Sequence, residues 1–260
     1  MDWLRWLPML PVLAASLWLH EWAHVFMIRY HGIHTEGIRL HAAGLVARAR
    51  PLDELTLPQR ATVYLAGPVA NALVAGWTFT VHTLSYVGVN WLYNIALINI
   101  VLCVFNLLPL LPLDGGRVLQ LAMGHRMGIG RANRLLLRIS RRGAVALMAL
   151  GLVQVVFFPF NITLFVAGVF IWRQSKVLPP VLFAENLRAL HYKPRLFTTR
   201  TPPATRVLRV PAHFTVGDAL AYLCWRRFCV FWVAGHSHPI GEDVVLSFVS
   251  TPGLPLSDVS

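Results

Sequence analysis

Long apolar runs separated by short polar connections are the dominant pattern along this chain. Apolar residues dominate residues 3–30, 61–89 and 91–113, and a further uncharged run covers residues 143–172. A helix needs about 20 apolar residues to cross the hydrocarbon core of a bilayer. The first three runs therefore predict one membrane-spanning helix each. The fourth is interrupted by Pro159-Phe160-Asn161, so one long tilted helix and a hairpin of two short spans both fit it.

The positions of the basic residues along the chain favour one of these two arrangements. The chain has a formal net charge of +12, and its positive clusters follow the first run, follow the third run and resume at Arg173. Only the hairpin brings all these clusters to one side, which the positive-inside rule makes the cytoplasmic side. We therefore expect an α-helical polytopic membrane protein with about five spans, an outer N-terminus and a cytoplasmic C-terminus. In that setting the arginines indicate contact with the lipid bilayer rather than with nucleic acid.

The first apolar run contains the motif HEWAH, from His20 to His24. Residues four apart lie on one face of a helix, so His20 and His24 can offer two imidazole nitrogens to one zinc ion, with Glu21 beside them as a proton acceptor. A chance match is the alternative, because three fixed positions recur by accident in soluble chains. Ionisable side chains are costly inside an apolar span and mark functional sites there. The setting of the motif therefore favours a zinc site.

A catalytic zinc usually has three protein ligands and one water. Asp114 follows the third run in the segment NLLPLLPLDGGR, and it is the only carboxylate besides Glu21 that adjoins an apolar run with proline and glycine around it. We therefore predict one Zn²⁺ per chain, bound by His20, His24 and Asp114. Glu21 would accept a proton from the water that attacks a carbonyl and pass it to the leaving amine.

An oxyanion that develops in such a reaction needs a hydrogen-bond donor. Asn106, eight residues before Asp114 in the same run, is the first candidate, and Asn71 in the second run is the other. Hydrogen bonding between helices explains both asparagines equally well, so both interpretations stay open.

Two other clusters contain residues that can bind metals. One is His31, His34 and His41, just beyond the first run, and the other is Cys224, Cys229, His236 and His238. We interpret the first cluster as solvated histidines beside a basic loop. The cysteines of the second are five apart, which is wider than the spacing of two to four typical of zinc ligand pairs, so we expect them to pack in a core. Three cysteines also provide no disulfide framework.

The remaining segments predict a second, smaller domain. Residues 37–50 form either a short hairpin or an ordinary loop, since their periodicity fits both. We expect a first domain over residues 1–176, a proline-rich linker over 177–205, and a small α+β domain over 206–260. In this last domain the pattern predicts a strand, a helix with Thr215 at its N-cap, a second strand, a turn over 236–241 and a last strand over 244–249.

Three motifs occur together in order: HEWAH, then GPVAN over residues 67–71, then NLLPLLPLDGG. Over residues 3–116 the chain resembles the site-2 protease family of intramembrane zinc metalloproteases, which implies a three-span metalloprotease core. The resemblance implies His20, His24 and Asp114 as zinc ligands, Glu21 as catalytic base, and Asn106 near the substrate carbonyl. It also implies a membrane-associated sheet in the 37–50 region that pairs with an extended substrate.

The segment over residues 206–233 is similar to one CBS repeat, a module that often binds adenine nucleotides in pairs. Site-2 proteases with such a tail include the stage IV sporulation protease that processes a pro-sigma factor, and this chain looks closest to that branch. The resemblance implies a multi-pass protein of the bacterial cell membrane, a membrane-tethered protein substrate and an inhibitory membrane protein as a further partner. It also implies ATP at the CBS-like domain. Only one repeat is visible, so a nucleotide site would need a second chain in a homo-oligomer.

Two other functions compete with this interpretation. A transporter or receptor would reuse the helix bundle without hydrolysis, but it has no need for Glu21 beside two ligand histidines or for the turn at Asp114. A protease of the same family with another substrate, such as an anti-sigma factor or a signal-peptide remnant, is closer. Those branches commonly carry a PDZ insertion between the core spans, and no insertion of that size is present here. We therefore favour the pro-sigma factor as substrate.

Overall fold

The computed structural model describes residues 7–33, 35–41, 44–49, 52, 55–85, 90–157, 162–196, 204–223 and 227–259. The chain divides into two compact units. The first unit consists of Met1–Val118 and Ile139–Lys176, and the second of Leu119–Arg138 and Val177–Ser260.

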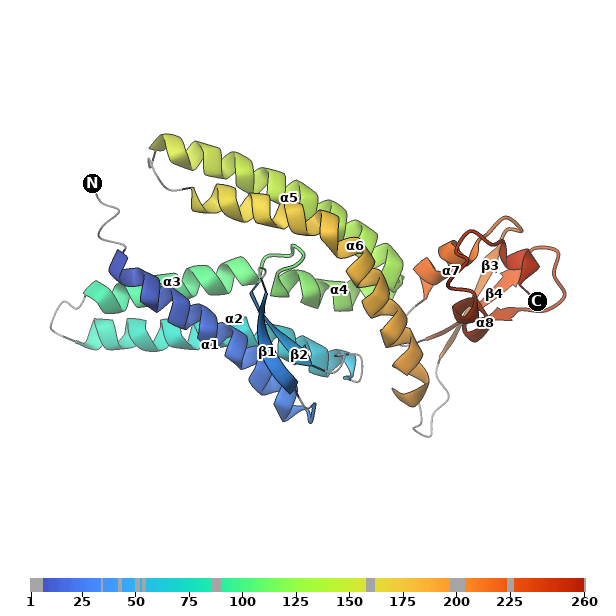
Figure 1. Cartoon of the computed structure of the whole chain (residues 1–260), viewed down its shortest axis with the longest axis horizontal. Helices are drawn as coiled ribbons and strands as arrows, with labels where there is room; N and C mark the ends of the chain where they lie inside the picture. Colours follow the sequence, from blue (N-terminus) through green and yellow to red (C-terminus); the bar gives the residue numbers. More distant parts are fainter. Residues whose placement is uncertain are drawn as a thin grey trace. The chain divides into compact units, whose positions relative to one another are not determined.

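Three helices build the centre of the first unit (Figure 1). They are α1 (Leu10–Tyr30), preceded by the 3-10 turn η2 (Leu7–Met9), α2 (Leu57–Leu84) and α3 (Asn90–Asn106). Helix α2 packs against both α1 and α3. The three apolar runs are thus confirmed as helices. The third helix ends at Asn106, three residues before Pro109, because a proline restricts the residue before it and cannot donate to the helix.

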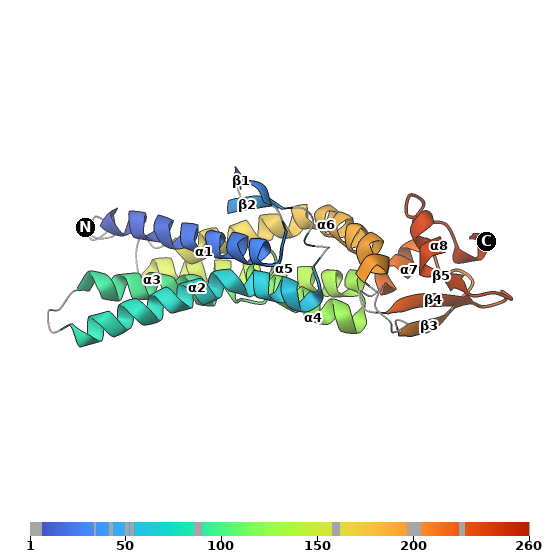
Figure 2. The same cartoon turned by 90° about the horizontal axis from the view of Figure 1, so that it is seen from below.

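A two-stranded antiparallel hairpin follows α1. Strand β1 (Thr35–His41) pairs with β2 (Gly44–Ala49), with Ile38 opposite Ala47 and His41 opposite Gly44. The hairpin lies against α1 (Figure 2). Of the two structures that the periodicity of residues 37–50 allowed, the hairpin is therefore the one that forms.

The fourth apolar run also forms a hairpin, in this case of helices. Helix α5 (Ile129–Phe157) ends before Pro159-Phe160-Asn161, which lie outside the described residues, and α6 (Thr163–Leu196) begins after them. The two helices approach closely where they carry glycine: a Cβ atom at Gly151 would collide with Phe165, and one at Gly168 would lie 2.7 Å from Met148. The prediction of two helices in this run is confirmed. Helix α6 also continues to Leu196, so residues 177–196 of the predicted linker are helical.

The apolar character of these helices bears on the predicted spans. Within the part of the chain that the structure describes, no helix is both long and apolar enough to cross a membrane. The number of spans and their orientation stay predictions.

The second unit contains a three-stranded sheet in the order β3-β4-β5. Strand β3 (Thr205–Val210) pairs in parallel with β4 (Phe228–Val233), which pairs antiparallel with β5 (Ile240–Gly241). Helix α7 (Val216–Tyr222) connects the parallel strands, as predicted. The Thr215 hydroxyl accepts a hydrogen bond from the Asp218 N–H, and the Asp218 carboxylate accepts one from the Thr215 N–H. This reciprocal cap confirms Thr215 as the start of the helix.

The predicted last strand over residues 244–249 is wrong. Helix α8 (Glu242–Ser247) covers most of this segment, and the 3-10 turn η4 (Leu256–Asp258) follows. A short apolar run fits a strand and a buried helix equally well, so periodicity alone could not decide. The two acidic residues Glu242 and Asp243 in the first turn favour a helix, because negative charge stabilises the helix N-terminus. The Glu242 carboxylate also accepts a hydrogen bond of 2.9 Å from the Cys229 N–H of β4.

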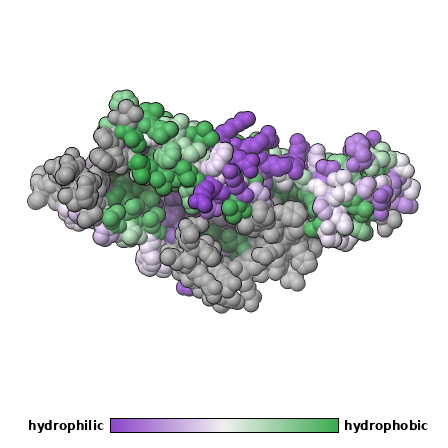
Figure 3. Space-filling model, turned by 45° about the horizontal axis from the view of Figure 1, so that its top comes forward, coloured by the Kyte–Doolittle hydropathy of each residue, from purple (hydrophilic) through white to green (hydrophobic). Residues whose placement is uncertain are grey.

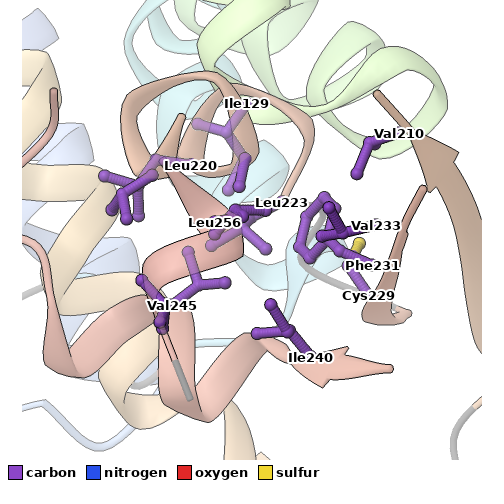
Figure 4. Packing of buried hydrophobic residues seen from close by; sticks show 13 residues of the cluster. Ile129, Val210, Leu220, Leu223, Cys229, Phe231, Val233, Ile240, Val245 and Leu256 are labelled. Atoms are coloured by element: carbon purple, nitrogen blue, oxygen red, sulfur yellow. The ribbon is translucent and has the colours of Figure 1, made fainter. Parts of the chain in front are cut away.

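The core of the second unit lies between the sheet and its helices (Figure 4). Phe231 of β4 is the largest fully buried side chain among the described residues, and Leu223, Val245 and Leu256 of the same cluster have no exposed surface either. Ile129, the first residue of α5, joins the same cluster, and its N–H donates to the Leu223 carbonyl at 3.0 Å. One contiguous core therefore supports this unit.

Candidate metal centre

Two histidines of α1 and one aspartate of α4 (Asp114–Met127) converge in the first unit. The His20 Nε2 atom lies 3.1 Å from Asp114 Oδ2, and the His24 Nε2 atom lies 3.4 Å from the same oxygen. The two Nε2 atoms are 3.2 Å apart, and all the donor atoms of this group lie within 4.8 Å of one another. His20 is buried, whereas His24 and Asp114 are half-buried. The structure thus brings together the three residues that we predicted as ligands.

Helix α2 fixes the direction of the His24 ring. His24 Nδ1 lies 2.7 Å from the Val63 carbonyl oxygen, which can only accept a hydrogen bond, so Nδ1 carries the proton. In this tautomer the Nε2 atom carries a lone pair and points toward His20 and Asp114. The two rings meet edge to face, with centroids 4.8 Å apart. Helical spacing brings the two side chains together, and the α2 carbonyl orients one of them.

The turn between α3 and α4 places Asp114 beside the histidines. Its Leu111 N–H donates to the Ser140 hydroxyl of α5 at 2.8 Å, and both residues are fully buried. Leu110 and Leu113 pack in a cluster with Ala144 and Ile171 of the α5–α6 hairpin. The two glycines after Asp114 let this turn lie directly on α4, because a Cβ atom at either would collide with the turn backbone.

Gly67 of α2 lies opposite the two imidazole rings. A Cβ atom at this position would be 2.5 Å from His24 Nε2 and 2.6 Å from His20 Nε2, which is closer than real side chains approach. Glycine at this position therefore lets α2 lie directly against both imidazole rings.

Glu21 follows His20 on α1 and is half-buried. Its carboxyl group interacts electrostatically with His24, His20 and Asp114. A carboxylate next to this group of donors has the position expected of a proton acceptor beside a metal.

The two asparagines proposed as oxyanion donors differ in their surroundings. Asn71 is fully buried, and its amide nitrogen lies 3.1 Å from His20 Nδ1, on the side of the ring away from Asp114. Asn106 is the last residue of α3, is half-buried, and donates from Nδ2 to the Leu102 carbonyl of its own helix. Of these two asparagines, only Asn71 has a described hydrogen bond to the histidine pair.

The other predicted clusters form no further metal group within the described residues, where His20, His24 and Asp114 are the only such set. His31 lies 2.9 Å from the Thr62 hydroxyl, while His34 and the His41 side chain lie outside the described part. Cys229 is buried in the core of the second unit, as expected, and His236 Nε2 lies 3.0 Å from the Ser257 carbonyl. Cys224 is also outside the described residues.

Sequence reasoning missed two contributions of α2, the Val63 carbonyl that orients His24 and the close approach of Gly67 to both imidazole rings. Val63, Gly67 and Asn71 are spaced four apart and therefore lie on one face of the helix. Gly67 and Asn71 have the same four-residue spacing as His20 and His24. The sequence could therefore have suggested that this face of α2 packs against the histidine face of α1. A backbone carbonyl leaves no trace in the sequence.

Comparisons with known proteins give one family and several relatives. Residues 83–150 match Peptidase family M50. The chain is 25% identical over 191 residues to the zinc metalloprotease MJ0392 of Methanocaldococcus jannaschii, covering 71% of this chain and 54% of that protein. It is 35% identical over 157 residues to Rip3 of Mycobacterium tuberculosis, covering 56% of this chain and 38% of that protein. The chain thus spans about half or less of the length of these curated relatives.

The fold is also similar to a solved structure, the site-2 protease from Methanocaldococcus jannaschii. The TM-score is 0.50 at 25% identity, with 64% of this chain and 74% of that chain covered. The family match, the relatives and the solved structure agree in their similarity to the site-2 protease family, Peptidase family M50, whose matched relatives are named zinc metalloproteases.

Proposed function

We propose that this chain is an intramembrane zinc metalloprotease that cleaves a membrane-associated protein. The convergence of His20, His24 and Asp114, with Glu21 beside them, is the observation that carries the proposal. Two imidazole nitrogens and one carboxylate oxygen are a donor set typical of catalytic zinc, which keeps a fourth position for water. Gly67 lets α2 lie against both imidazole rings, because a Cβ atom there would collide with their Nε2 atoms.

Each residue of the site has a distinct part in peptide hydrolysis. His20, His24 and Asp114 would hold the ion, which supplies Lewis acidity for activating water and polarising the substrate carbonyl. Glu21 accepts the proton of the attacking water and delivers it to the leaving amine. Asn106 stays our candidate for the oxyanion donor, and its amide would have to turn away from the Leu102 carbonyl to reach a substrate.

The β1–β2 hairpin supports a way of presenting the substrate. A helical peptide satisfies its own carbonyls internally, so it must be extended before hydrolysis. A strand edge can hold an extended peptide through backbone hydrogen bonds. We propose that the hairpin beside α1 adds the substrate as a further strand.

The surface of the first unit supports a location in the bacterial cell membrane. Large apolar side chains are exposed along its helices, including Trp18 on α1, Trp77 on α2 and Val104 on α3. Figure 3 shows hydrophobic residues gathered on the surface of the α5–α6 hairpin as well. Water disfavours such a surface, whereas lipid does not. We propose a multi-pass arrangement with the C-terminus in the cytoplasm, based on the positive clusters.

For the substrate we propose a pro-sigma factor, with an anti-sigma factor or a signal-peptide remnant as the alternative. The first choice rests on the resemblance of residues 206–233 to one CBS repeat, and the strand–helix–strand order of β3, α7 and β4 is compatible with that resemblance. In this proposal the second unit is a regulatory domain that binds ATP in a homo-oligomer. A transporter or receptor would not need Glu21 beside the converging donors.

Co-expression with membrane-tethered precursors tests the proposed activity. We expect a shortened product from the pro-sigma precursor with the full chain, and none with Glu21→Gln or with a zinc chelator. The Glu21→Gln chain should still contain zinc, because Glu21 is not among the three converging donors. Cleavage of only an anti-sigma or signal-peptide precursor would select the alternative substrate. Cleavage that persists in Glu21→Gln would overturn the mechanism.

A further inference from the structure

We propose that Asn71 is a positioning residue that fixes the tautomer and ring direction of His20. The inference rests on the proposed zinc site and gives Asn71 a role toward His20 in place of the oxyanion role considered for it from the sequence. Asn71 has no exposed surface, and His20 is only 3% exposed. The Asn71 amide nitrogen lies 3.1 Å from His20 Nδ1, the ring nitrogen that faces away from Asp114.

The position of the His20 ring decides which nitrogen carries its proton. Nε2 lies 3.1 Å from Asp114 Oδ2 and 3.2 Å from His24 Nε2, so this nitrogen is the one directed at the candidate metal position. A nitrogen that binds a metal must offer a lone pair. With a metal held at Nε2, the proton of neutral His20 would therefore reside on Nδ1, which would donate toward Asn71.

A donor at Nδ1 requires an acceptor from Asn71. The oxygen and nitrogen of an asparagine amide are nearly equal in size, and the hydrogen-bond network decides which faces a partner. With the nitrogen toward His20, the Asn71 Oδ1 atom is buried and has no hydrogen-bond partner among the described residues. Rotating the amide by about 180° brings Oδ1 onto the Nδ1–H group. One rotation thus satisfies both the buried oxygen and the tautomer that metal binding requires.

His24 shows the same arrangement with a backbone acceptor. The Val63 carbonyl lies 2.7 Å from His24 Nδ1, and Val63, Gly67 and Asn71 follow one another at four-residue spacing on α2. This face of α2 therefore gives each histidine an acceptor, and Gly67 between the two acceptors lets the helix lie against both rings. An acceptor on the remote nitrogen fixes the ring and raises its basicity, and its loss typically weakens metal binding by about 10–100-fold.

The alternative is that Asn71 only links two helices and has no effect on the metal site. Asn99 is a suitable control for this alternative. Asn99 is also fully buried, and its amide donates to the Ser16 hydroxyl of α1 at 3.0 Å, one helical turn before His20. This asparagine joins α3 to α1 without contacting either histidine through a described hydrogen bond. Asn99→Leu therefore removes a buried amide, as Asn71→Leu does, but it leaves the candidate metal centre unchanged.

Zinc affinity of the purified full-length chain tests the inference. We would measure the dissociation constant by chelator competition for the native chain and for Asn71→Leu, Asn71→Asp, Asn99→Leu and Asp114→Asn, together with the visible absorption spectrum of the Co²⁺-loaded forms. We expect Asn71→Leu to weaken zinc binding by about 10–100-fold and to alter the Co²⁺ spectrum. Asn71→Asp should restore near-native affinity, because a carboxylate accepts from Nδ1–H. Asn99→Leu should lower thermal stability with little change in affinity.

The remaining outcomes separate this inference from the proposed function. Equal zinc affinities for Asn71→Leu and Asn99→Leu, or a loss in Asn71→Asp as large as in Asn71→Leu, would overturn the positioning role. Asp114→Asn should lose zinc whatever Asn71 does. Full zinc content in Asp114→Asn would instead contradict the metal site itself.

Discussion

Gly67 is the residue of α2 that limits how closely this helix approaches the histidine pair. A Cβ atom there would lie 2.5 Å from His24 Nε2, inside any normal contact distance. We predict that Gly67→Ala displaces at least one imidazole and lowers both zinc content and the cleavage rate. Misplacing a catalytic group by about 1 Å can cost roughly 100-fold in rate. Metal analysis and a cleavage assay on the purified variant measure the two effects.

Gly76 is the matched control on the same helix. A Cβ atom at Gly76 would meet no other atom within 4 Å. Gly76→Ala should therefore leave zinc content and cleavage unchanged, and it should raise stability slightly, since alanine favours a helix over glycine by about 0.5–1 kcal/mol. A similar loss of zinc in both variants would show that glycine at position 67 matters for the helix rather than for the site.

At the scale of elements, the turn between α3 and α4 links the α5–α6 hairpin to Asp114. The Ser140 hydroxyl accepts from the Leu111 N–H, and both groups are fully buried. We predict that Ser140→Ala leaves this N–H without its acceptor and lowers the unfolding free energy by about 1–3 kcal/mol. Zinc affinity should fall as well, because Asp114 follows three residues later. Thermal denaturation and metal titration test both effects.

Ser175 of α6 is a suitable comparison for Ser140. It is also fully buried, but its hydroxyl donates to the Trp172 carbonyl of its own helix. Replacing it by alanine removes a bond within one helix and leaves no buried N–H unpaired. The change in stability should therefore be smaller, and zinc affinity should stay the same. Equal effects of the two alanine variants would argue against the turn as the element that holds Asp114.

Some helices and strands could be predicted from their own sequence, and others could not. Long apolar runs predicted α1, α2 and α3, because 20 or more apolar residues leave little alternative to a helix. The short run at residues 244–249 was compatible with a strand, and burial against Phe231 and the sheet decided for α8. Asp114 was predicted as the third ligand because it is the only carboxylate besides Glu21 that adjoins an apolar run with proline and glycine around it. The turn that brings Asp114 to His20 depends on Ser140, about 30 residues away, and no local pattern indicates such a contact.

At the scale of the whole molecule, exposed apolar side chains are distributed unequally between the two units. On α2 of the first unit, Leu73 and Trp77 are 69% and 73% exposed and lie one helical turn apart. In the described residues of the second unit, the exposed large apolar side chains are Val177, Val207 and Trp232. If lipid surrounds the first unit alone, a charge should be costly on α2 and tolerated on β3.

We therefore predict opposite outcomes for arginine at these positions. In the double variant Leu73→Arg, Trp77→Arg, each arginine costs about 2.5–3.5 kcal/mol at the centre of a bilayer, so the carbonate-resistant membrane fraction should fall sharply. Val207→Arg, which also adds charge at an exposed apolar position, should remain in that fraction at the native level. In water all three exposed positions would accept arginine with little effect. The contrary result is that carbonate extracts the native chain and the double variant equally. That result would place the first unit outside the bilayer and refute the intramembrane site.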